Sequence, residues 1–381
     1  MRLALLGVDD QMLHVAAAAV RTGRHQIAMI DALSPRVKEA AALAPNARLV
    51  DNADAMLDNQ SVDAVLVSAD HPSTRVDQLR RLIQVGMPVL VSHPISLSML
   101  DCYELDMIRA ETRSLVLAYL PARWHPAAVQ LGGLIDGATA SPIGPVEQIV
   151  CERFLADRRR DMVLKQFARD ADLLQFLASD ATKLHALGSS KAAAGINPYT
   201  NLSVQLTTAE GLVARWSVSP IESDSGARLT FVGSEGKAIL WMPDSEEPWQ
   251  LEFRTPKETS TTDYPNWDAP AEAMENFSLA LEHNETDSNW PEAARTIELA
   301  ETIDRSLAKG RTIDLHNEQF SEVGTFKGMM ASVGCALLMV GLMMVLVVAI
   351  VRAIAVQAGW NWLAGKLDAW PYLLLAVCAV Y

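Results

Sequence analysis

Cysteine is scarce in this sequence: only four occur among 381 residues. Cys102 and Cys151 lie in segments of mixed composition, whereas Cys335 and Cys378 lie in a hydrophobic C-terminal tail, and this scatter does not suit a disulfide framework. No pair has the CxxC spacing and no HExxH motif occurs, so we predict no metal site. The cysteines are expected to be reduced and to pack as small apolar side chains.

Positive charge is also in deficit. Lysine and arginine together number 32 against 46 aspartates and glutamates, which gives a formal net charge of −14 and a pI near 5.0. A nucleic-acid partner needs a basic patch for its phosphates, so no nucleic acid is expected to bind. An anionic lipid surface would likewise repel the water-soluble part of the chain.

The N-terminus lacks the long apolar core and the small-residue cleavage site of a secretory signal. Residues 1–7 read MRLALLG, a short apolar run that ends at a glycine. We therefore expect this segment to stay in the mature protein and to form the first strand of its fold.

Apolar residues are abundant enough for real cores, at 50% of the chain, and 381 residues exceed one ordinary domain. Residues 1–120 alternate short apolar runs with helical patterns, which predicts an α/β domain of the Rossmann type with a parallel sheet. The runs are continuous because helices cover both faces of such a sheet. The predicted strands are 3–6, 27–30, 64–67, 88–91 and 115–119, and the predicted helices are 11–21, 34–42 and 75–85.

Residues 121–316 have a different pattern, which predicts an α+β domain with a large, open, mostly antiparallel sheet. Two amphipathic helices are expected near its end, and the second has Asn289 as its N-cap and Gly310 as its end. The predicted helices are 167–177, 271–281 and 291–308, and the predicted strands are 202–206, 212–218, 229–232 and 238–242.

A polar linker at 317–327 leads to a hydrophobic C-terminal segment, 328–381, that we interpret as a membrane anchor. Residues 328–351 carry no charge and are long enough to span a bilayer as a helix, which favours a span over a buried core helix. The apolar segment 369–381 is too short to span, and it is either an interfacial or re-entrant piece or part of a second helix. Residues 1–327 are expected to face the cytoplasm, because no secretory signal precedes them.

The turn after the first predicted strand is the place where a Rossmann domain binds a dinucleotide. Gly7 is the only one of three expected glycines there, and Asp9 and Asp10 place negative charge where phosphates would lie. Asp31, at the end of the second strand, is at the position of a carboxylate that binds ribose hydroxyls, which favours NAD over NADP. Taken alone, an ordinary strand-end aspartate explains Asp31 as well.

Several segments, in order and spacing, resemble those of the glucose–fructose oxidoreductase / inositol dehydrogenase family (Gfo/Idh/MocA), over residues 1 to about 316. Residues 86–94, GMPVLVSHP, resemble its GKHVLVEKP segment, and residues 169–177, RDADLLQFL, resemble its HxxDLLxxL helix. The other matching segments are 63–69 with 72–74, 123–126, 143–146, 231–240 and 295–315.

The resemblance implies a dinucleotide site at the ends of the parallel strands and a substrate site beside it. Its predicted catalytic residues are His93, Arg169 and Asp172. Its predicted cofactor-binding residues are Gly7, Asp9, Gln11, Met12, Asp31, Ala69, Asp70, His71, Ser92 and His93.

The departures from the family pattern fall on its catalytic positions. His93 stands where the resemblance implies a general acid/base lysine, and Arg169 stands where it implies a substrate-binding histidine. An imidazole can act as a base near neutral pH, so His93 is either catalytic or structural. Arginine cannot release a proton there, so Arg169 can only orient or bind an anionic group. Asp172 matches the family, but it can equally pair with a neighbouring base.

Two hypotheses of function follow. The first is a membrane-anchored, NAD-dependent oxidoreductase of a sugar, cyclitol or related polyol, with NADP less favoured. The second is a catalytically inactive relative that binds a nucleotide or sugar ligand as a sensor or scaffold, and a structural subunit without a ligand is a third, less favoured reading. A homo-oligomer is implied by the resemblance alone.

Overall fold

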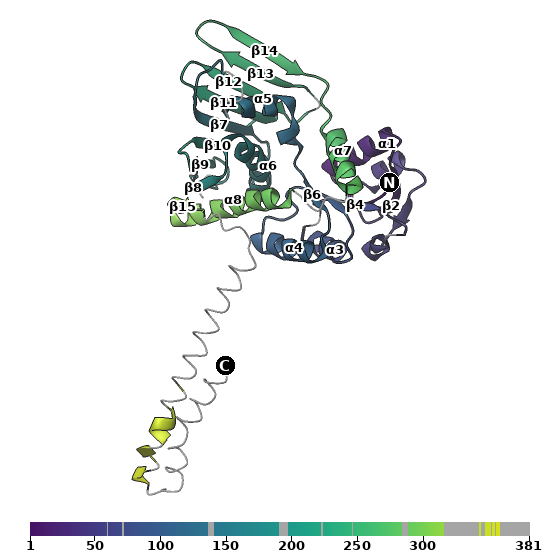
Figure 1. Ribbon diagram of the computed structural model, residues 1–381, viewed down its shortest axis with the longest axis vertical. Coiled ribbons are helices and arrows are strands. Elements are labelled where there is room, and N and C mark those ends of the chain that lie inside the picture. The colour runs from purple at the N-terminus through teal and green to yellow at the C-terminus, as the bar shows by residue number, and fades with distance from the viewer. Residues whose placement is uncertain are drawn as a thin grey trace. The chain divides into compact units, whose positions relative to one another are not determined.

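The computed structural model describes the two compact units of the chain, Met1–Leu315 and His316–Tyr381, to different extents (Figure 1). Each unit is described by itself. The described residues are 1–315, except 59, 71, 136–140, 190–196, 222–223, 246 and 284–288, together with 343, 347–351, 353–354 and 356–358.

The first sheet contains the parallel strands that the apolar runs predicted. Its strands are β1 (Arg2–Leu6), β2 (Gln26–Asp31), β3 (Arg48–Val50), β4 (Ala64–Val67), β5 (Val89–Ser92) and β6 (Val116–Tyr119). Their order is β3-β2-β1-β4-β5-β6, and every pair is parallel. This is the strand order of a Rossmann sheet. Strands are added in one direction from β1 to β3 and in the other from β4 to β6, and this reversal of strand order leaves a crevice at the carboxyl ends of the strands.

Helices cover both faces of this sheet, as its buried strands require. They are α1 (Asp10–Arg21), α2 (Val37–Leu43), α3 (Pro72–Gln84) and α4 (Met99–Thr112), with a 3-10 turn, η1 (Ala53–Leu57). The side chain of Asp9 accepts a hydrogen bond from the backbone N–H of Met12 and so begins α1. The sequence analysis did not predict α4 or β3, although Ser98 caps α4 in the same way.

The second sheet is large and mixed. Its strands are β7 (Val146–Phe154), β8 (Ala181–Leu187), β9 (Ser203–Thr208), β10 (Val213–Ser219), β11 (Gly226–Gly233), β12 (Lys237–Pro243), β13 (Trp249–Arg254), β14 (Thr259–Tyr264) and β15 (Ile313–Asp314). The order is β14-β13-β12-β11-β7-β10-β9-β8-β15, and β7 and β10 form a parallel pair in an otherwise antiparallel sheet. The expected mostly antiparallel sheet is therefore confirmed.

One face of this sheet packs on two helices, α5 (Pro126–Ile135) and α6 (Arg160–Ala178) (Figure 1). A 3-10 turn, η2 (Pro121–Trp124), precedes α5. Phe167 of α6 lies edge-on to Trp216 of β10, with ring centroids 5.2 Å apart, and both side chains are fully buried. Alternate residues of each strand point into this core. Charged residues of α6 that face the sheet are therefore buried, and they need ion-pair or hydrogen-bond partners within the core.

The last two helices, α7 (Ala269–Glu282) and α8 (Trp290–Lys309), return to the Rossmann sheet. Phe277 of α7 packs with the residues of α1, and Ile297 of α8 packs in the core under α3 and α4. The two sheets lie on either side of the boundary expected near residue 120. Their cores are nevertheless connected, because α8 contributes buried residues to both of them. Gly310 ends α8 in a left-handed conformation, with φ of +59°, as predicted.

The predicted N-cap of α8 is confirmed in its position. Asn289 occupies the N-cap position, but its side chain makes no capping hydrogen bond. Its amide instead donates to the carbonyl of Ala118 and accepts from the N–H of Ala118, both at 2.8 Å. Asn289 therefore fixes the start of α8 against the end of β6.

Cys102 and Cys151 are buried and unpaired, as expected of small apolar side chains. In the tail, none of the helices that the structure describes is both long and apolar enough to cross a membrane. Most of the predicted span at 328–351, and all of segment 369–381, lie outside the described residues.

Candidate functional site

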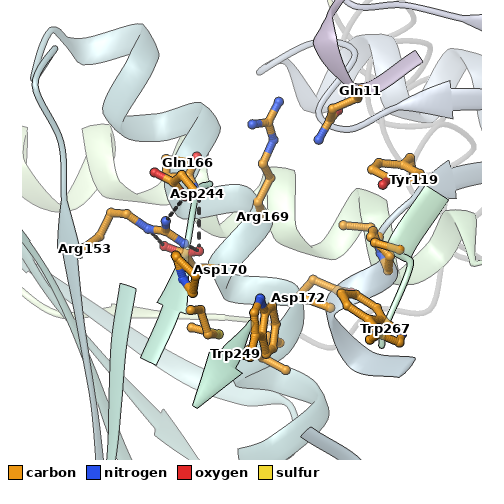
Figure 2. Close-up of a pocket in the computed structure, with 17 residues that line it drawn as sticks. Gln11, Tyr119, Arg153, Gln166, Arg169, Asp170, Asp172, Asp244, Trp249 and Trp267 are labelled. Carbon is orange, nitrogen blue, oxygen red and sulfur yellow. Dashed lines mark hydrogen bonds and ion pairs between the residues drawn. The ribbon is translucent and has the colours of Figure 1, made fainter. Parts of the chain in front are cut away.

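A cavity of about 290 Å³ lies where the carboxyl edge of the Rossmann sheet meets the second sheet (Figure 2). Gln11 of α1 and Tyr119 of β6 line it from the Rossmann side. The other side consists of α6, β7, the segment from the end of β12 to the start of β13, and the segment between β14 and α7. These contribute Arg153, Gln166, Arg169, Asp170, Asp172, Asp244, Trp249 and Trp267. Of the three predicted catalytic residues, Arg169 and Asp172 line this cavity.

Aromatic rings form one wall of the cavity. Trp249 of β13 stacks on the ring of His125, with centroids 3.9 Å apart, and Trp267 meets His125 edge-on at 4.5 Å. Burial lowers the pKa of His125 to about 4, so its ring is neutral at physiological pH. His125 was predictable from the sequence only as part of a junction segment, and neither tryptophan was predicted. Trp249 begins β13 and Trp267 follows β14, and the fold brings both rings against His125, just before α5.

A buried ion-pair network lies at the base of the cavity. Arg153 of β7 donates to Asp170 of α6 at 2.9 Å and to Asp244 at 2.8 Å. Asp170 also accepts from the indole N–H of Trp216 at 2.8 Å. Because Arg153 and Asp170 are both buried and each carries several charge-assisted bonds, this network is held rigidly.

Asp172 pairs with Arg123, as its alternative reading predicted. The Arg123 guanidinium donates through Nε at 3.1 Å and through a second, shorter bond from Nη2. Asp172 is fully buried. Burial raises the pKa of its carboxyl, and the bond from Arg123 opposes that shift. Arg123 therefore braces η2 against α6 while Asp172 faces the cavity.

Arg169 extends from α6 toward Gln11, at the border between the two sheets (Figure 2). Its Nε donates to the backbone carbonyl of His93 at 2.8 Å. Burial lowers the pKa of its guanidinium, and the carboxylates around it oppose that effect from a distance. Among the residues that the structure describes, Arg169 has no ion-pair partner.

His93 is buried under α8 and is not among the residues that line the cavity. Its Nε2 lies 2.8 Å from the hydroxyl of Thr296, which itself donates to the carbonyl of Ala293. Nε2 must therefore carry the proton and donate to Thr296. Burial first, and then the positive charges of Arg169 and Arg123, lower the pKa of His93 to about 3. Its catalytic role stays a prediction, while its visible contact is structural.

The turn at Gly7 is closely packed. Gly7 has φ of +74°, and a Cβ there would lie 2.2 Å from Ser68 Oγ and 2.4 Å from Arg75 Nη2. Asp9 accepts hydrogen bonds from the N–H groups of Met12, at 2.8 Å, and Ala69, at 3.0 Å, so both of its oxygens have partners. Asp10 pairs with Arg36. Both carboxylates therefore have partners within the chain, and their effect on a bound pyrophosphate stays a prediction.

Asp31 also has partners. One oxygen accepts from the N–H of Leu33 at 3.0 Å, and the other lies 3.3 Å from the guanidinium of Arg75. Arg75 also donates to Asp70 at 2.8 Å and to Gln78 at 2.8 Å, and only 3% of its surface is exposed. Arg75 was not predicted as a site residue. The sequence feature that could have indicated it is a charged residue at the start of a helix beside the predicted nucleotide loop.

The residues at this edge nevertheless suit a dinucleotide. Gln11 Oε1, Ser68 Oγ and Ser92 Oγ are buried without hydrogen-bond partners among the described residues, so a ligand can satisfy them. The N-terminus of α1 adds a positive dipole end and first N–H groups that have no partner within the helix itself. Met12 contributes its backbone, since its side chain is in the core, and His71 lies outside the described residues.

Comparison with known proteins agrees with this reading. Residues 1–119 match the model of a family described as an oxidoreductase family with an NAD-binding Rossmann fold. A curated relative, D-apiose dehydrogenase from Paraburkholderia graminis, is 23% identical over 315 residues, which cover 77% of this chain and 84% of the relative.

Solved structures share the fold over most of the chain. Myo-inositol dehydrogenase from Corynebacterium glutamicum superposes with a TM-score of 0.64 and 21% identity, covering 83% of this chain and 99% of that one. Aldose-aldose oxidoreductase from Caulobacter crescentus, complexed with glycerol, gives a TM-score of 0.68 at 15% identity, covering 83% and 99%. An oxidoreductase from Agrobacterium radiobacter, in complex with NAD+, L-tartaric acid and magnesium, gives 0.66 at 16%, covering 82% and 98%.

The fold is thus a Rossmann domain joined to a second domain built on a large mixed sheet, and a cavity lies where the two meet. The family match lies within the Rossmann domain, and the solved structures share the fold of both domains.

Proposed function

We propose that this protein is a nicotinamide-dependent oxidoreductase that acts on a sugar, a cyclitol or a related polyol. The observation that carries the proposal is the position of the cavity. Gln11 and Tyr119 line it from the carboxyl edge of the Rossmann sheet, beside the N-terminus of α1. A substrate in the cavity would therefore adjoin a dinucleotide bound at that edge.

The lining suits a polyol. The faces of Trp249 and Trp267 offer apolar surface for C–H groups, while the polar side chains around them offer hydrogen bonds to hydroxyls. The relatives named D-apiose dehydrogenase and myo-inositol dehydrogenase act, by those names, on such compounds. The bound nicotinamide would exchange a hydride with the substrate carbon.

Oxidation of an alcohol also requires a group that takes the hydroxyl proton. Asp172 is the carboxylate of the predicted catalytic set that faces the cavity, and burial raises its pKa toward the range useful for proton transfer. His93 remains the alternative predicted from the sequence. We propose NAD as the preferred cofactor because Asp31 ends β2, and we expect weak binding because Arg75 already holds that carboxylate.

A catalytically inactive relative is the second candidate. Arg75 fills part of the nucleotide edge, and Arg169 and His93 replace the residues that the family resemblance implies for catalysis. Such a protein would still bind a ligand in the cavity and act as a sensor or scaffold.

Two measurements separate these candidates. Calorimetric titration of the full-length protein with NAD, NADH and NADP is expected to show binding, with NAD tighter than NADP. A screen of sugars, cyclitols and linear polyols is then expected to show cofactor reduction that Asp172→Asn abolishes. Binding without turnover on any substrate would favour the inactive relative, and absence of dinucleotide binding would refute the enzyme proposal.

We also propose, from composition alone, that residues 328–351 anchor the chain in a membrane with residues 1–327 in the cytoplasm. The run is uncharged and is flanked by Lys327 and Arg352, whose side chains can reach the two interfaces. Full-length protein that leaves the membrane fraction on alkaline washing would refute the anchor. Digestion of the N-terminal part by protease on intact spheroplasts would refute the orientation.

A further inference from the structure

Arg169 is the cation of the cavity that has no anionic partner among the described residues. Its Nε is used by the carbonyl of His93 at 2.8 Å, which directs the guanidinium toward Gln11 and the Rossmann edge (Figure 2). The two Nη groups therefore retain donors that no described carboxylate accepts. A largely enclosed guanidinium in this position is costly unless an anion joins it, because burial disfavours its charge.

The carboxylates that line the cavity are already committed to other cations. Asp170 accepts from Arg153 at 2.9 Å and from Trp216 at 2.8 Å, and Asp172 accepts from Arg123. Asp244 accepts from Arg153 at 2.8 Å at the solvent-exposed rim. Moving any of these toward Arg169 would break a bond that it now makes, so none of the described carboxylates that line the cavity is free to pair with Arg169.

Trp267 provides a second, independent observation. It lines the same cavity, and its indole N–H is buried without an acceptor among the described residues. An unpaired buried donor costs free energy that a ligand oxygen would recover. Together with the two Nη groups of Arg169, it gives the cavity open donors that match the oxygens of an anionic ligand, and the unpaired Oε1 of Gln11 adds an acceptor that suits a hydroxyl of the same ligand.

We infer that the preferred substrate carries a carboxylate that Arg169 binds, so that among sugars and polyols the protein favours acid derivatives, such as an aldonate, a uronate or a related hydroxy acid, over the neutral compounds. The inference rests on the proposed function and narrows its substrate class. The aromatic wall of Trp249 and Trp267 then holds the carbon chain, while Arg169 fixes its acidic end near the border with the Rossmann sheet. Arg169 is a specificity-determining residue in this scheme.

Binding can be tested without turnover. The full-length protein would be titrated by calorimetry with D-gluconate and with D-glucitol, which differ in a carboxylate replacing a terminal hydroxymethyl group, with and without saturating NADH. D-glucuronate and L-tartrate would extend the set of acids. We expect D-gluconate to bind at least about tenfold more tightly than D-glucitol, as one charge-assisted pair provides.

Three variants complete the test. Arg169→Gln removes the charge and should weaken D-gluconate binding by about tenfold or more while changing D-glucitol binding little. Arg169→Lys should retain part of the preference. Arg159→Gln, on an exposed arginine just before α6, serves as the matched control and should change neither affinity.

Equal affinity for D-gluconate and D-glucitol, an equal loss of both in Arg169→Gln, or no binding of any of the three acids would overturn the inference. Faster turnover of D-glucitol than of D-gluconate by the native protein would also overturn it, and would leave the proposed oxidoreductase standing. Absence of dinucleotide binding, with carboxylate selectivity retained, would instead refute the proposed oxidoreductase and keep the carboxylate site.

Discussion

The guanidinium of Arg75 lies 3.3 Å from the carboxylate of Asp31, and both side chains are buried at the nucleotide edge of the Rossmann sheet. Asp31 ends β2, where a carboxylate would bind the hydroxyls of an adenosine ribose. Arg75 also reaches Asp70 and the space above Gly7. A dinucleotide must therefore compete with Arg75 for Asp31.

Arg75→Gln is expected to raise the ratio of NAD to NADP affinity by about tenfold, because it frees Asp31 for ribose hydroxyls while leaving a polar side chain for Asp70. Calorimetry on the full-length protein measures both affinities. The gain should vanish when Asp31→Asn is added, whereas Asp31→Asn alone should change NAD binding little. An unchanged ratio in Arg75→Gln would mean that the ribose does not reach Asp31.

Asp9 is expected to act as a helix cap. Asp9→Ala should lower the free energy of unfolding by about 1–2 kcal/mol, because it removes the bonds to the N–H groups of Met12 and Ala69. Asp10→Ala, on an exposed neighbour, is the matched control and should change it by less than about 0.5 kcal/mol. Urea denaturation measures both. Stability unchanged in Asp9→Ala, with tighter NAD binding, would restore the view that Asp9 repels the pyrophosphate.

His93 is expected to make the fold sensitive to acid. Its pKa is about 3 in the folded state, against the ordinary value of 6.5. Between pH 6.5 and pH 3 the imidazole binds a proton in the unfolded chain but stays neutral in the folded chain. The contribution of His93 to stability is therefore complete above pH 6.5 and is lost as the pH falls toward 3. The expected slope from this group is about 1.4 kcal/mol per pH unit, and His125 adds to it because its pKa is also lowered, to about 4.

Urea denaturation between about pH 5 and pH 8 tests this prediction. His93→Gln should reduce the slope, even if it lowers stability throughout the range, while His14→Gln, on an exposed ring, should leave the slope unchanged. The same slope in His93→Gln and the native protein would show that His93 is not held neutral.

The Arg123–Asp172 pair is expected to be essential for the fold as well as for the site. Arg123→Met leaves the fully buried carboxylate of Asp172 without a counter-charge and should cost about 3–5 kcal/mol of unfolding free energy. Arg254→Gln breaks an exposed pair with Glu252 and should cost less than about 1 kcal/mol. A small loss in Arg123→Met that equals the loss in Arg254→Gln would contradict a desolvated pair.

The Rossmann strands were predictable because their signal is local. Residues 64–67 are an uninterrupted apolar run, and β4 has those same bounds because a parallel strand buried on both faces needs only apolar side chains. β14 had no such signal. Its residues, TSTTDY, are mostly exposed, and they form a strand because β13 offers them a backbone edge with which to pair.

The sequence by itself determined the class of fold, the presence of Asp31 at a nucleotide edge, and the placement of Arg169 and Asp172 on one helix. Periodicity and spacing along the chain contain that information. Only the tertiary structure decided which charges meet. Arg75 and Asp31 are 44 residues apart and Arg123 and Asp172 are 49 apart, and which arginine neutralises which carboxylate depends on packing between distant elements. The same packing left Arg169 without an anionic partner among the described residues, because burial makes each ion pair a property of the folded surroundings and not of the residue types alone.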